Sequence, residues 1–209
     1  VAIGNLERFA ADWARSQPDI PLPPLPPKTG KKVAVVGSGP AGLTAASDLA
    51  RWGYEVTVFE AQERAGGMLR YGVPSYRLPD DQLDKDLEYI RSLGVEIRFN
   101  TRVGREVSFD ELLAGFDALF FSTGLSKPSK MRIEGEDHPR VLSGLQVLED
   151  VANGKDPGVG SRVAVIGGGN VAMDAARVSR RMGADVEILY RRRIQDMPAD
   201  PEEILESQQ

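Results

Sequence analysis

Short apolar runs alternate with amphipathic segments along most of the chain. Each run is rich in β-branched or aromatic side chains and ends near a glycine or a polar residue, which is typical of strands in a parallel sheet. The runs at residues 31–37 and 116–124 are apolar enough to predict burial. In all, we expect strands at residues 31–37, 55–60, 95–100, 116–124, 161–167 and 185–190, and a shorter strand leading into a helix over 103–113.

Between these runs, apolar residues recur every three or four positions, which predicts helices. The clearest case is residues 80–93, where an acidic first turn precedes Leu83, Leu87, Ile90 and Leu93. Strands that alternate with helices in this way predict an α/β fold. Further helices are expected over residues 4–16, 38–53, 143–153 and 168–183.

The N-terminal residues differ from the rest of the chain. A helix over residues 4–16 is followed by six prolines between Pro18 and Pro27. This stretch can neither continue a helix nor pair inside a sheet, so we expect an extended connector along the surface. A proline motif that binds a partner is the alternative.

A strand, a glycine loop, a helix and a second strand occur twice in the chain. The first copy covers residues 31–60 and the second covers residues 161–190. This internal repeat predicts three parts. They are an N-terminal helix and linker at 1–30, a Rossmann-like domain at 31–160, and the start of a second Rossmann-like domain at 161–209.

The first glycine loop reads Gly-Ser-Gly-Pro-Ala-Gly from Gly37 to Gly42. Gly37 permits a tight turn, Gly39 lets the main chain approach a pyrophosphate, and Gly42 lets the helix pack close to the strands. Pro40 and Ala41 begin that helix, whose N-terminus favours an anion. A tight turn without any ligand is the alternative.

The residue that ends the second strand of each copy predicts which nucleotide binds. Glu60 lies close to the ~20-residue spacing expected after the first glycine. A carboxylate there accepts hydrogen bonds from ribose hydroxyls and repels a 2′-phosphate. FAD or NAD therefore fits the first loop, and NADP does not.

The second copy has no acidic residue at this place. Tyr190 replaces it and is followed by Arg191 and Arg192, whose guanidinium groups suit a 2′-phosphate and favour NADPH over NADH. A solvated basic face or a partner-docking patch is the alternative. Alanine, Ala172, takes the third glycine position and still permits close packing. The candidate loop contacts to NADPH are Gly167, Gly169, Asn170 and Val171.

Composition removes several other chemistries. The chain has no cysteine, which excludes a disulfide, a redox dithiol, a cysteine nucleophile and cysteinyl iron–sulfur ligands within it. Its single histidine, His138, excludes a multi-histidine zinc site and lies in a polar turn. A net charge of −5 gives no reason to expect nucleic acid or an anionic membrane. No apolar run reaches the ~20 residues that span a bilayer, and we expect a cytoplasmic protein.

Two adjacent nucleotide units, one acidic and one basic at the matching position, predict a division of labour. The first would hold FAD and the second would bring NADPH to it. Because hydride passes directly from nicotinamide to flavin, no catalytic side chain is required. A non-catalytic nucleotide-binding or scaffolding module is the alternative. An FAD monooxygenase or amine oxidase would leave Arg191 and Arg192 without a role.

Seven stretches occur in the order of a known family: NLERFAADWA, VAVVGSGPAGL, VTVFE, GGMLRYGVPSYRLP, FFSTG, GGGNVAMDAAR and YRRR. On these residues the chain resembles the small subunit of NADPH-dependent glutamate synthase and its relatives, including the flavin–NADPH region of dihydropyrimidine dehydrogenase. The resemblance covers almost the whole chain. It implies a flavoprotein that takes hydride from NADPH and passes electrons through iron–sulfur clusters to a larger partner subunit.

Residues 61–79 form a glycine- and proline-rich loop whose length already indicates function or mobility. The resemblance implies that part of this loop runs past the flavin, that Arg77 contacts it, and that Val103 contacts the adenine. It also implies that the Thr-Gly turn after residue 122 links the two domains near the flavin, although Ser122 replaces the usual alanine. The implied flavin contacts are Gly66, Gly67, Met68, Leu69, Arg77, Val103, Thr123 and Gly124.

Two departures from the family lead us to expect a piece of a longer polypeptide. The cysteines that bind iron–sulfur clusters in the family would precede residue 1, so the clusters are expected upstream or in a partner. The segment that closes the FAD domain and the rest of the NADP domain would follow the last residue. For the chain alone we expect weakened FAD affinity and an exposed sheet edge that favours self-association.

Overall fold

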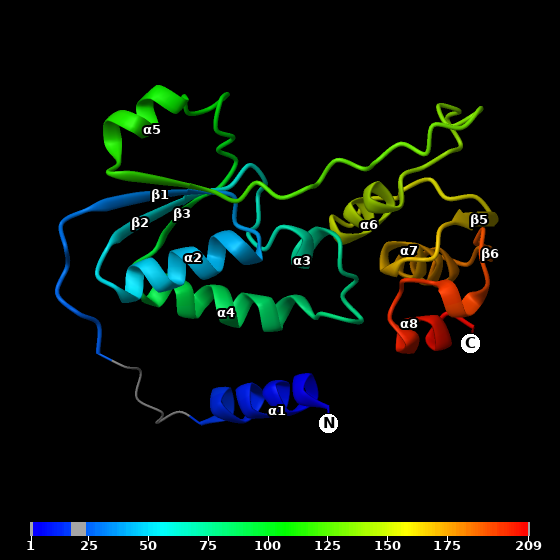
Figure 1. Cartoon of the computed structure of the whole chain (residues 1–209), viewed down its shortest axis with the longest axis horizontal. Coiled ribbons are helices and arrows are strands. Elements are labelled where there is room, and N and C mark those ends of the chain that lie inside the picture. Colours follow the sequence, from blue (N-terminus) through cyan, green and yellow to red (C-terminus); the bar gives the residue numbers. More distant parts are fainter. Residues whose placement is uncertain (1, 18–23, 209) are drawn as a thin grey trace.

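The computed structural model describes residues 2–17 and 24–208 (Figure 1). The chain begins with α1 (Ile3–Ser16), which matches the helix expected over residues 4–16. Most of the predicted proline-rich connector falls on residues 18–23, which lie outside the described residues.

The first copy of the repeat opens a four-stranded parallel sheet. Its strands lie in the order β3-β2-β1-β4, so the chain starts in the middle of the sheet and adds strands on both sides. This order is typical of a Rossmann-like domain and confirms the predicted α/β class. The strands are β1 (Lys32–Val36), β2 (Glu55–Phe59), β3 (Glu96–Arg98) and β4 (Ala118–Phe121).

Helices cover both faces of this sheet (Figure 1). On one face lie α2 (Pro40–Arg51) and α4 (Asp80–Ser92), and over the other lies α5 (Phe109–Gly115). Successive side chains of a strand point to opposite faces, so Val35 packs in the cluster under α2 and α4 while Val36 packs in the cluster under α5. Burying a side chain of this size contributes about 1.5–3 kcal/mol.

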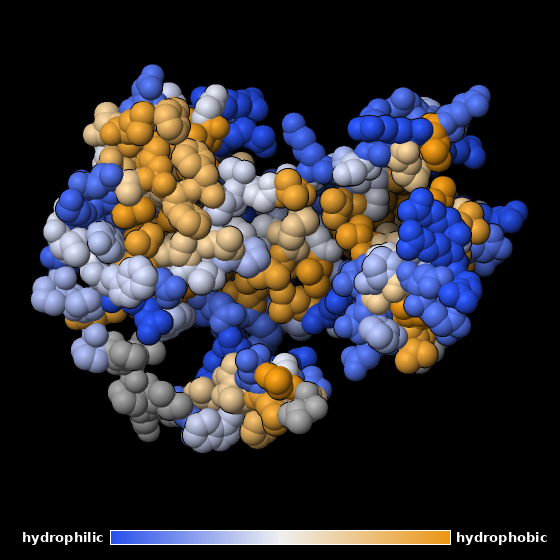
Figure 2. Space-filling view, viewed as in Figure 1, coloured by the Kyte–Doolittle hydropathy of each residue, from blue (hydrophilic) through white to orange (hydrophobic). Residues whose placement is uncertain are grey.

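The apolar strand at β4 is less buried than its sequence predicts. Phe120 is 41% exposed and Phe121 is 53% exposed, because β4 is the edge of the sheet and pairs only with β1 among the described strands. The ring of Phe109 stacks on Phe121 at 6.0 Å between centroids. Phe109, Leu113 and Phe121 form an apolar surface patch over α5 and β4, at the upper left of Figure 2.

The second copy forms a separate two-stranded parallel sheet, β5 (Arg162–Ile166) and β6 (Asp185–Leu189), joined by α7 (Asn170–Arg181). Helix α7 covers only one face of the pair. Side chains on the other face are open, as shown by Ile166 at 59% and Leu189 at 49% exposure. The pair therefore has the topology of the first strands of a Rossmann-like sheet, without its second layer of helices in the described chain.

Four elements depart from the sequence-based expectation or were not expected. The strand expected near residue 103 is only an isolated bridge between Val103 and Val107. The loop over residues 61–79 contains a short helix, and two further helices follow β6. Pro201 at the first helical position and the Asp200 side chain at the cap could have predicted the last of them. The additional helices are α3 (Met68–Tyr71), η1 (Ile194–Asp196) and α8 (Pro201–Glu206), and the expected helix between the units is α6 (Gly144–Ala152).

Helix α5 begins with a reciprocal cap that should be measurable. Ser108 Oγ accepts from the Glu111 N–H at 3.1 Å, and the Glu111 carboxylate accepts from the Ser108 N–H at 2.7 Å. We expect Ser108→Ala to lower the free energy of unfolding by about 1 kcal/mol, measured by urea denaturation. Ser92→Ala is the control, because its exposed hydroxyl donates only to the Tyr89 carbonyl and should change stability by less than about 0.5 kcal/mol. Equal losses of unfolding free energy in the two variants would contradict the role of Ser108 as the cap of α5.

Candidate functional site

The first glycine loop joins β1 to α2 by close contacts between main-chain atoms. Gly37 has a φ of +100°, and a Cβ built there would lie 2.5 Å from the Ser122 carbonyl oxygen. A Cβ on Gly42 would lie 2.0 Å from the Gly37 oxygen. Both positions therefore require glycine, one for the turn and one for the approach of the helix.

Gly39 is open where its neighbours are crowded. A Cβ built on it would meet no described atom within 4 Å. Gly39 is the N-cap of α2 and provides no side-chain cap, and Pro40 follows it at the first helical position. Among the described residues, the helix N-terminus thus faces open space with uncapped N–H groups, the arrangement that binds phosphate at a helix start.

The 66–69 segment forms a wall beside this opening. Gly67 has a φ of +54°, and a Cβ on it would lie 2.8 Å from the Cα of Gly39. The Gly66 N–H donates to the Ser38 carbonyl at 3.0 Å. Met68, which starts α3, is 37% exposed, while Leu69 is half-buried. The structure thus brings the loop that family resemblance assigns to the flavin against the first glycine loop.

Glu60 holds the same loop in place through hydrogen bonds. It is 7% exposed, and its Oε2 accepts from the Ser38 N–H at 2.9 Å and from the Ser38 hydroxyl. Its Oε1 accepts from the Gln62 N–H at 2.8 Å. A carboxylate has about four acceptor positions, so three are used within this chain. Ser38 was not singled out by sequence reasoning, although its position inside the glycine motif was a signal.

The remaining residues implied for the flavin are divided between two places. Thr123 and Gly124 are exposed and follow β4, and the Thr123 Cα would lie 3.3 Å from a Cβ on Gly37. Ser122 donates its hydroxyl to the Val36 and Gly37 carbonyls, which ties this turn to the glycine loop. Val103 is half-buried and packs instead on the cluster under α5.

Arg77 points to the second unit. Its guanidinium lies 2.8 Å from Asp174 Oδ2 on α7 and 2.7 Å from Glu203 Oε1 on α8. The Asp174 side chain is almost fully buried, and burial raises its pKa while Arg77 acts in the opposite direction. Sequence reasoning did not select Asp174, because a single aspartate on an amphipathic helix carries no signal of its partner.

The second glycine loop is covered by the tail that follows β6. Gly168 lies under the ring of Tyr190, whose carbons would be 2.7 Å from a Cβ there. The Ala199 N–H donates to the Gly168 carbonyl at 3.0 Å, and the Asp200 N–H donates to the Asn170 side chain at 2.8 Å. The side-chain oxygen of Asn170 is therefore occupied by a hydrogen bond to this tail.

The other residues predicted for NADPH lie around the start of α7. Gly169 is the N-cap of α7 and has no side-chain cap within the described chain, while Gly167 adopts a φ of +149° and Val171 is exposed. Arg191 and Arg192 follow β6, are exposed, and pair with no acidic side chain of the described residues. The next arginine differs, because Arg193 is 3.2 Å from Asp196.

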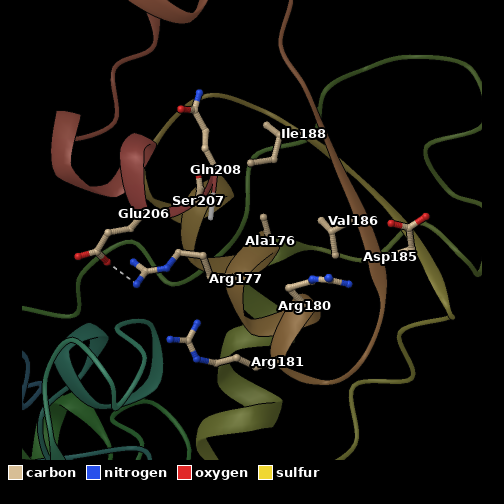
Figure 3. Close-up of a pocket in the computed structure, with 10 residues that line it drawn as sticks. All are labelled: Ala176, Arg177, Arg180, Arg181, Asp185, Val186, Ile188, Glu206, Ser207 and Gln208. Carbon is tan, nitrogen blue, oxygen red and sulfur yellow. Dashed lines mark hydrogen bonds and ion pairs between the residues drawn. The ribbon is translucent and has the colours of Figure 1, made fainter.

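Other candidate sites are weaker. A cavity of about 650 Å³ lies between α7, β6 and residues 206–208, and none of the predicted nucleotide contacts line it (Figure 3). Within the described part of the chain, no group of three or more metal-binding side chains is arranged as a site. No described helix combines the length and apolarity needed to cross a membrane.

A family model and several characterised relatives match this chain. The model, described as pyridine nucleotide-disulphide oxidoreductase, matches residues 31–207. The β subunit of NADP(+)-dependent formate dehydrogenase from Moorella thermoacetica is 49% identical over 184 residues, which cover 86% of this chain and 26% of that protein. The NADPH-Fe(3+) oxidoreductase β subunit of Geobacter sulfurreducens is 41% identical over 98% of this chain and 31% of its own length.

The resemblance to glutamate synthase small chains is confirmed by the Escherichia coli K12 protein, which is 38% identical over 98% of this chain and 46% of its own length. A 2-naphthoyl-CoA reductase complex has a TM-score of 0.70 at 29% identity, covering 88% of this chain and 27% of that one. FprA from Mycobacterium tuberculosis in complex with NADPH has the same fold, with a TM-score of 0.74 at 24% identity over 84% of this chain and 46% of that one. The chain spans a quarter to about half the length of these relatives.

Two glycines of the first loop offer a matched test of the site. Gly42→Ala should lower the free energy of unfolding by about 1–3 kcal/mol, because its methyl group meets the Gly37 carbonyl. Gly39→Ala should cost less than about 1 kcal/mol, because its methyl group enters open space. The same methyl group narrows the opening, so Gly39→Ala should weaken FAD binding. Thermal unfolding and flavin fluorescence titration measure the two effects, and unchanged FAD affinity in Gly39→Ala would refute this site.

Tyr76 gives a pH-dependent prediction. Its ring lies under Arg181 and Arg177 at 4.0 and 4.5 Å, and burial raises its pKa to about 12. The raised pKa means that folding favours the neutral phenol. Its contribution to stability is complete below the unfolded pKa of ~10 and is lost as pH rises towards 12. Ultraviolet titration should show a late phenol ionisation that is absent in Tyr76→Phe and retained in the control Tyr89→Phe.

Proposed function

The chain belongs to the pyridine nucleotide-disulphide oxidoreductase family, and on this basis we propose that it is the flavin- and NADPH-binding part of an electron-transfer oxidoreductase. The proposal keeps the predicted division into a first unit at residues 31–160 and a second unit at 161–209. FAD belongs to the first unit and NADPH to the second.

One observation carries this assignment: the two copies of the repeat differ where nucleotide choice is made. Glu60 is acidic and buried at the end of β2, whereas Arg191 and Arg192 follow β6, exposed and without acidic partners among the described residues. An acidic residue disfavours a 2′-phosphate and two arginines favour it. Two nucleotides of different kinds are therefore expected side by side on one chain.

The residues around Gly39 fit the pyrophosphate of FAD. The missing Cβ, the uncapped start of α2 and the adjoining 66–69 segment leave space where an anion would be stabilised. Glu60 would offer its remaining acceptor position to the ribose while it holds Ser38. When bound, FAD accepts a hydride and releases electrons singly. The flavin contacts that we propose are Gly37, Gly39, Pro40, Ala41, Gly42, Glu60, Gly67, Met68, Leu69, Val103, Thr123 and Gly124, with Arg77 as a further contact.

The second unit would bind NADPH through its loop and its arginine pair. Gly169 leaves the start of α7 uncapped, and Arg191 and Arg192 present two guanidinium groups. Charge-assisted hydrogen bonds to phosphate are about twice as strong as neutral ones. Gly167, Asn170 and Val171 complete the proposed contacts.

The electron acceptor would lie outside this chain. The relatives are named for formate dehydrogenase, Fe(3+) oxidoreductase and glutamate synthase, yet the similarity of each covers 86–98% of this chain. This similarity supports the proposal that the matched part binds the nucleotides, whatever the acceptor is. We propose that electrons leave through iron–sulfur clusters, upstream or in a partner, to a larger catalytic subunit in the cytoplasm. The apolar patch over α5 and β4 is a surface on which the isolated chain could self-associate.

A second candidate is a non-catalytic nucleotide-binding or scaffolding module. The observation that favours it is α1, whose apolar residues remain open, as Phe9 at 70% and Trp13 at 56% exposure show. Such a helix would suit a partner surface without any redox role. Anaerobic addition of NADPH to the FAD-loaded chain distinguishes the two, because the visible flavin band bleaches only in an oxidoreductase. Absence of both FAD uptake and bleaching would favour the scaffold.

The arginine pair supplies the test of nucleotide choice. Arg191→Ala with Arg192→Ala should raise the KM or Kd for NADPH by about 100-fold or more, since each of the two charged hydrogen bonds contributes about 1.5–3 kcal/mol and about 1.4 kcal/mol is tenfold. Affinity for NADH should change little. Arg193→Ala is the matched control, because that side chain already pairs with Asp196. An equal loss with NADPH and NADH would contradict the 2′-phosphate assignment.

A further inference from the structure

A compact polar cluster joins the two nucleotide units. It consists of Tyr76 and Arg77 from the loop before α4, and of Asp174, Arg177, Arg181 and Glu203 from α7 and α8; we call it the junction cluster. Arg77 contributes ion pairs at 2.8 Å to Asp174 and at 2.7 Å to Glu203. Only 5% of the Asp174 side chain and 12% of the Glu203 side chain are exposed, so these pairs are largely shielded from water.

Tyr76 provides the second half of the junction cluster. Its ring is contacted by Arg181 at 4.0 Å and by Arg177 at 4.5 Å, both from α7. Arg177 in turn pairs with Glu203 and Glu206, and Figure 3 shows it directed towards Glu206. Arg177 and Glu203 thus link the ring of Tyr76 to the ion pairs of Arg77. Cation–π contacts depend on the position of the cation over the ring.

The junction cluster lies on a short path between the two loops. Tyr76 and Arg77 belong to the same 61–79 segment as Gly67. A Cβ built on Gly67 would lie 2.8 Å from the Cα of Gly39. Asp174 lies about one helical turn into α7 from its N-cap, Gly169. A shift of α7 relative to the first unit would therefore change the spacing of the two loops and break the junction cluster at once.

The junction cluster is poorly arranged for stability alone. Within the described residues, neither the Tyr76 hydroxyl nor Asp174 Oδ1 has a hydrogen-bond partner, although both atoms are buried. A buried polar atom without a hydrogen-bond partner destabilises the folded state. Buried ion pairs are weak contributors to stability compared with apolar packing. Ion pairs do, however, require defined distances and orientations, so the junction cluster fixes how the two units are placed relative to each other.

We propose that Asp174, Glu203 and Tyr76 are positioning residues that fix the second glycine loop relative to the first through Arg77. The unit that brings NADPH is thereby held at a defined distance from the flavin loop. The fixed spacing of the two loops is inferred from the contacts of the junction cluster alone. Its consequence for hydride transfer rests on the proposed function. A displacement of about 1 Å in a reacting pair costs about 100-fold in rate.

The distance can be measured directly, because the chain has no cysteine and accepts two spin labels without background. Glu88→Cys on α4 and Glu187→Cys on β6 are exposed positions, one in each unit. Electron–electron double resonance should give one narrow distance distribution in the parent protein. Asp174→Asn, which removes the charge with little change of shape, should broaden or shift it. A distribution as narrow as that of the parent, in a folded Asp174→Asn protein, would overturn the proposal.

Two further variants keep this measurement decisive. Asp137→Asn makes the same chemical change in an exposed pair with Lys130 and should leave the distribution unaltered. If Asp174→Asn fails to fold by circular dichroism, Arg77→Lys replaces it. Lysine keeps the charge but cannot bind both carboxylates through a guanidinium fork, so it too should broaden the distribution. An unaltered distribution in folded Arg77→Lys would count against the junction cluster.

A kinetic measurement tests the consequence separately. In the FAD-loaded protein, Asp174→Asn should slow flavin reduction by bound NADPH by about 10- to 100-fold. FAD retention and the Kd for NADPH should stay within about threefold, because Asp174 contacts neither nucleotide in this proposal. A change confined to the Kd would overturn the positioning role. If NADPH does not reduce the flavin of the parent protein at all, the proposed function fails. The spin-label distances still decide whether the junction cluster fixes the spacing of the two units.

Discussion

Both nucleotide units depend on how closely the main chain can approach itself where a strand turns into a helix. In the first unit a Cβ on Gly42 would lie 2.0 Å from the Gly37 carbonyl, so no other residue fits. In the second unit Ala172 takes the position of Gly42, and a Cβ on Gly167 would lie 3.1 Å from the Ala172 Cβ. The first glycine of that loop therefore has little room for a side chain, while the third position carries one.

The fold could be predicted where local periodicity decides it. Strands at residues 31–37 and 55–60 and the helix over 80–93 follow from apolar spacing, and the repeat reveals that the same βαβ arrangement occurs twice. The exposure of Phe121 could not be predicted in this way. A strand at the edge and a strand in the centre of a sheet share one sequence pattern, because the pattern does not show how many neighbours the strand has.

The candidate site likewise has a part that could be predicted from local sequence and a part that could not. The motif around Gly39 and the acidic residue Glu60 were readable, because each acts within one βαβ unit. The additional task of Glu60, holding Ser38 by its N–H and hydroxyl, requires the loop's three-dimensional path. Arg77 and Asp174 are 97 positions apart, and no local rule connects them. Contacts between units therefore remain invisible in a single sequence even where both motifs are recognised.

In the function proposed for this chain, nucleotide choice and nucleotide spacing are controlled by different residues. Choice depends on the residues at the end of the second strand of each copy, and exposed side chains such as Arg191 can change there without disturbing a core. Spacing depends on the junction cluster, where Asp174 and Glu203 are shielded and mutually dependent. A scaffold organised in this way can keep its NADPH-to-flavin geometry constant while the rest of the assembly varies. The differing names of its relatives are consistent with that separation, since the proposal places the electron acceptor outside both sets of residues.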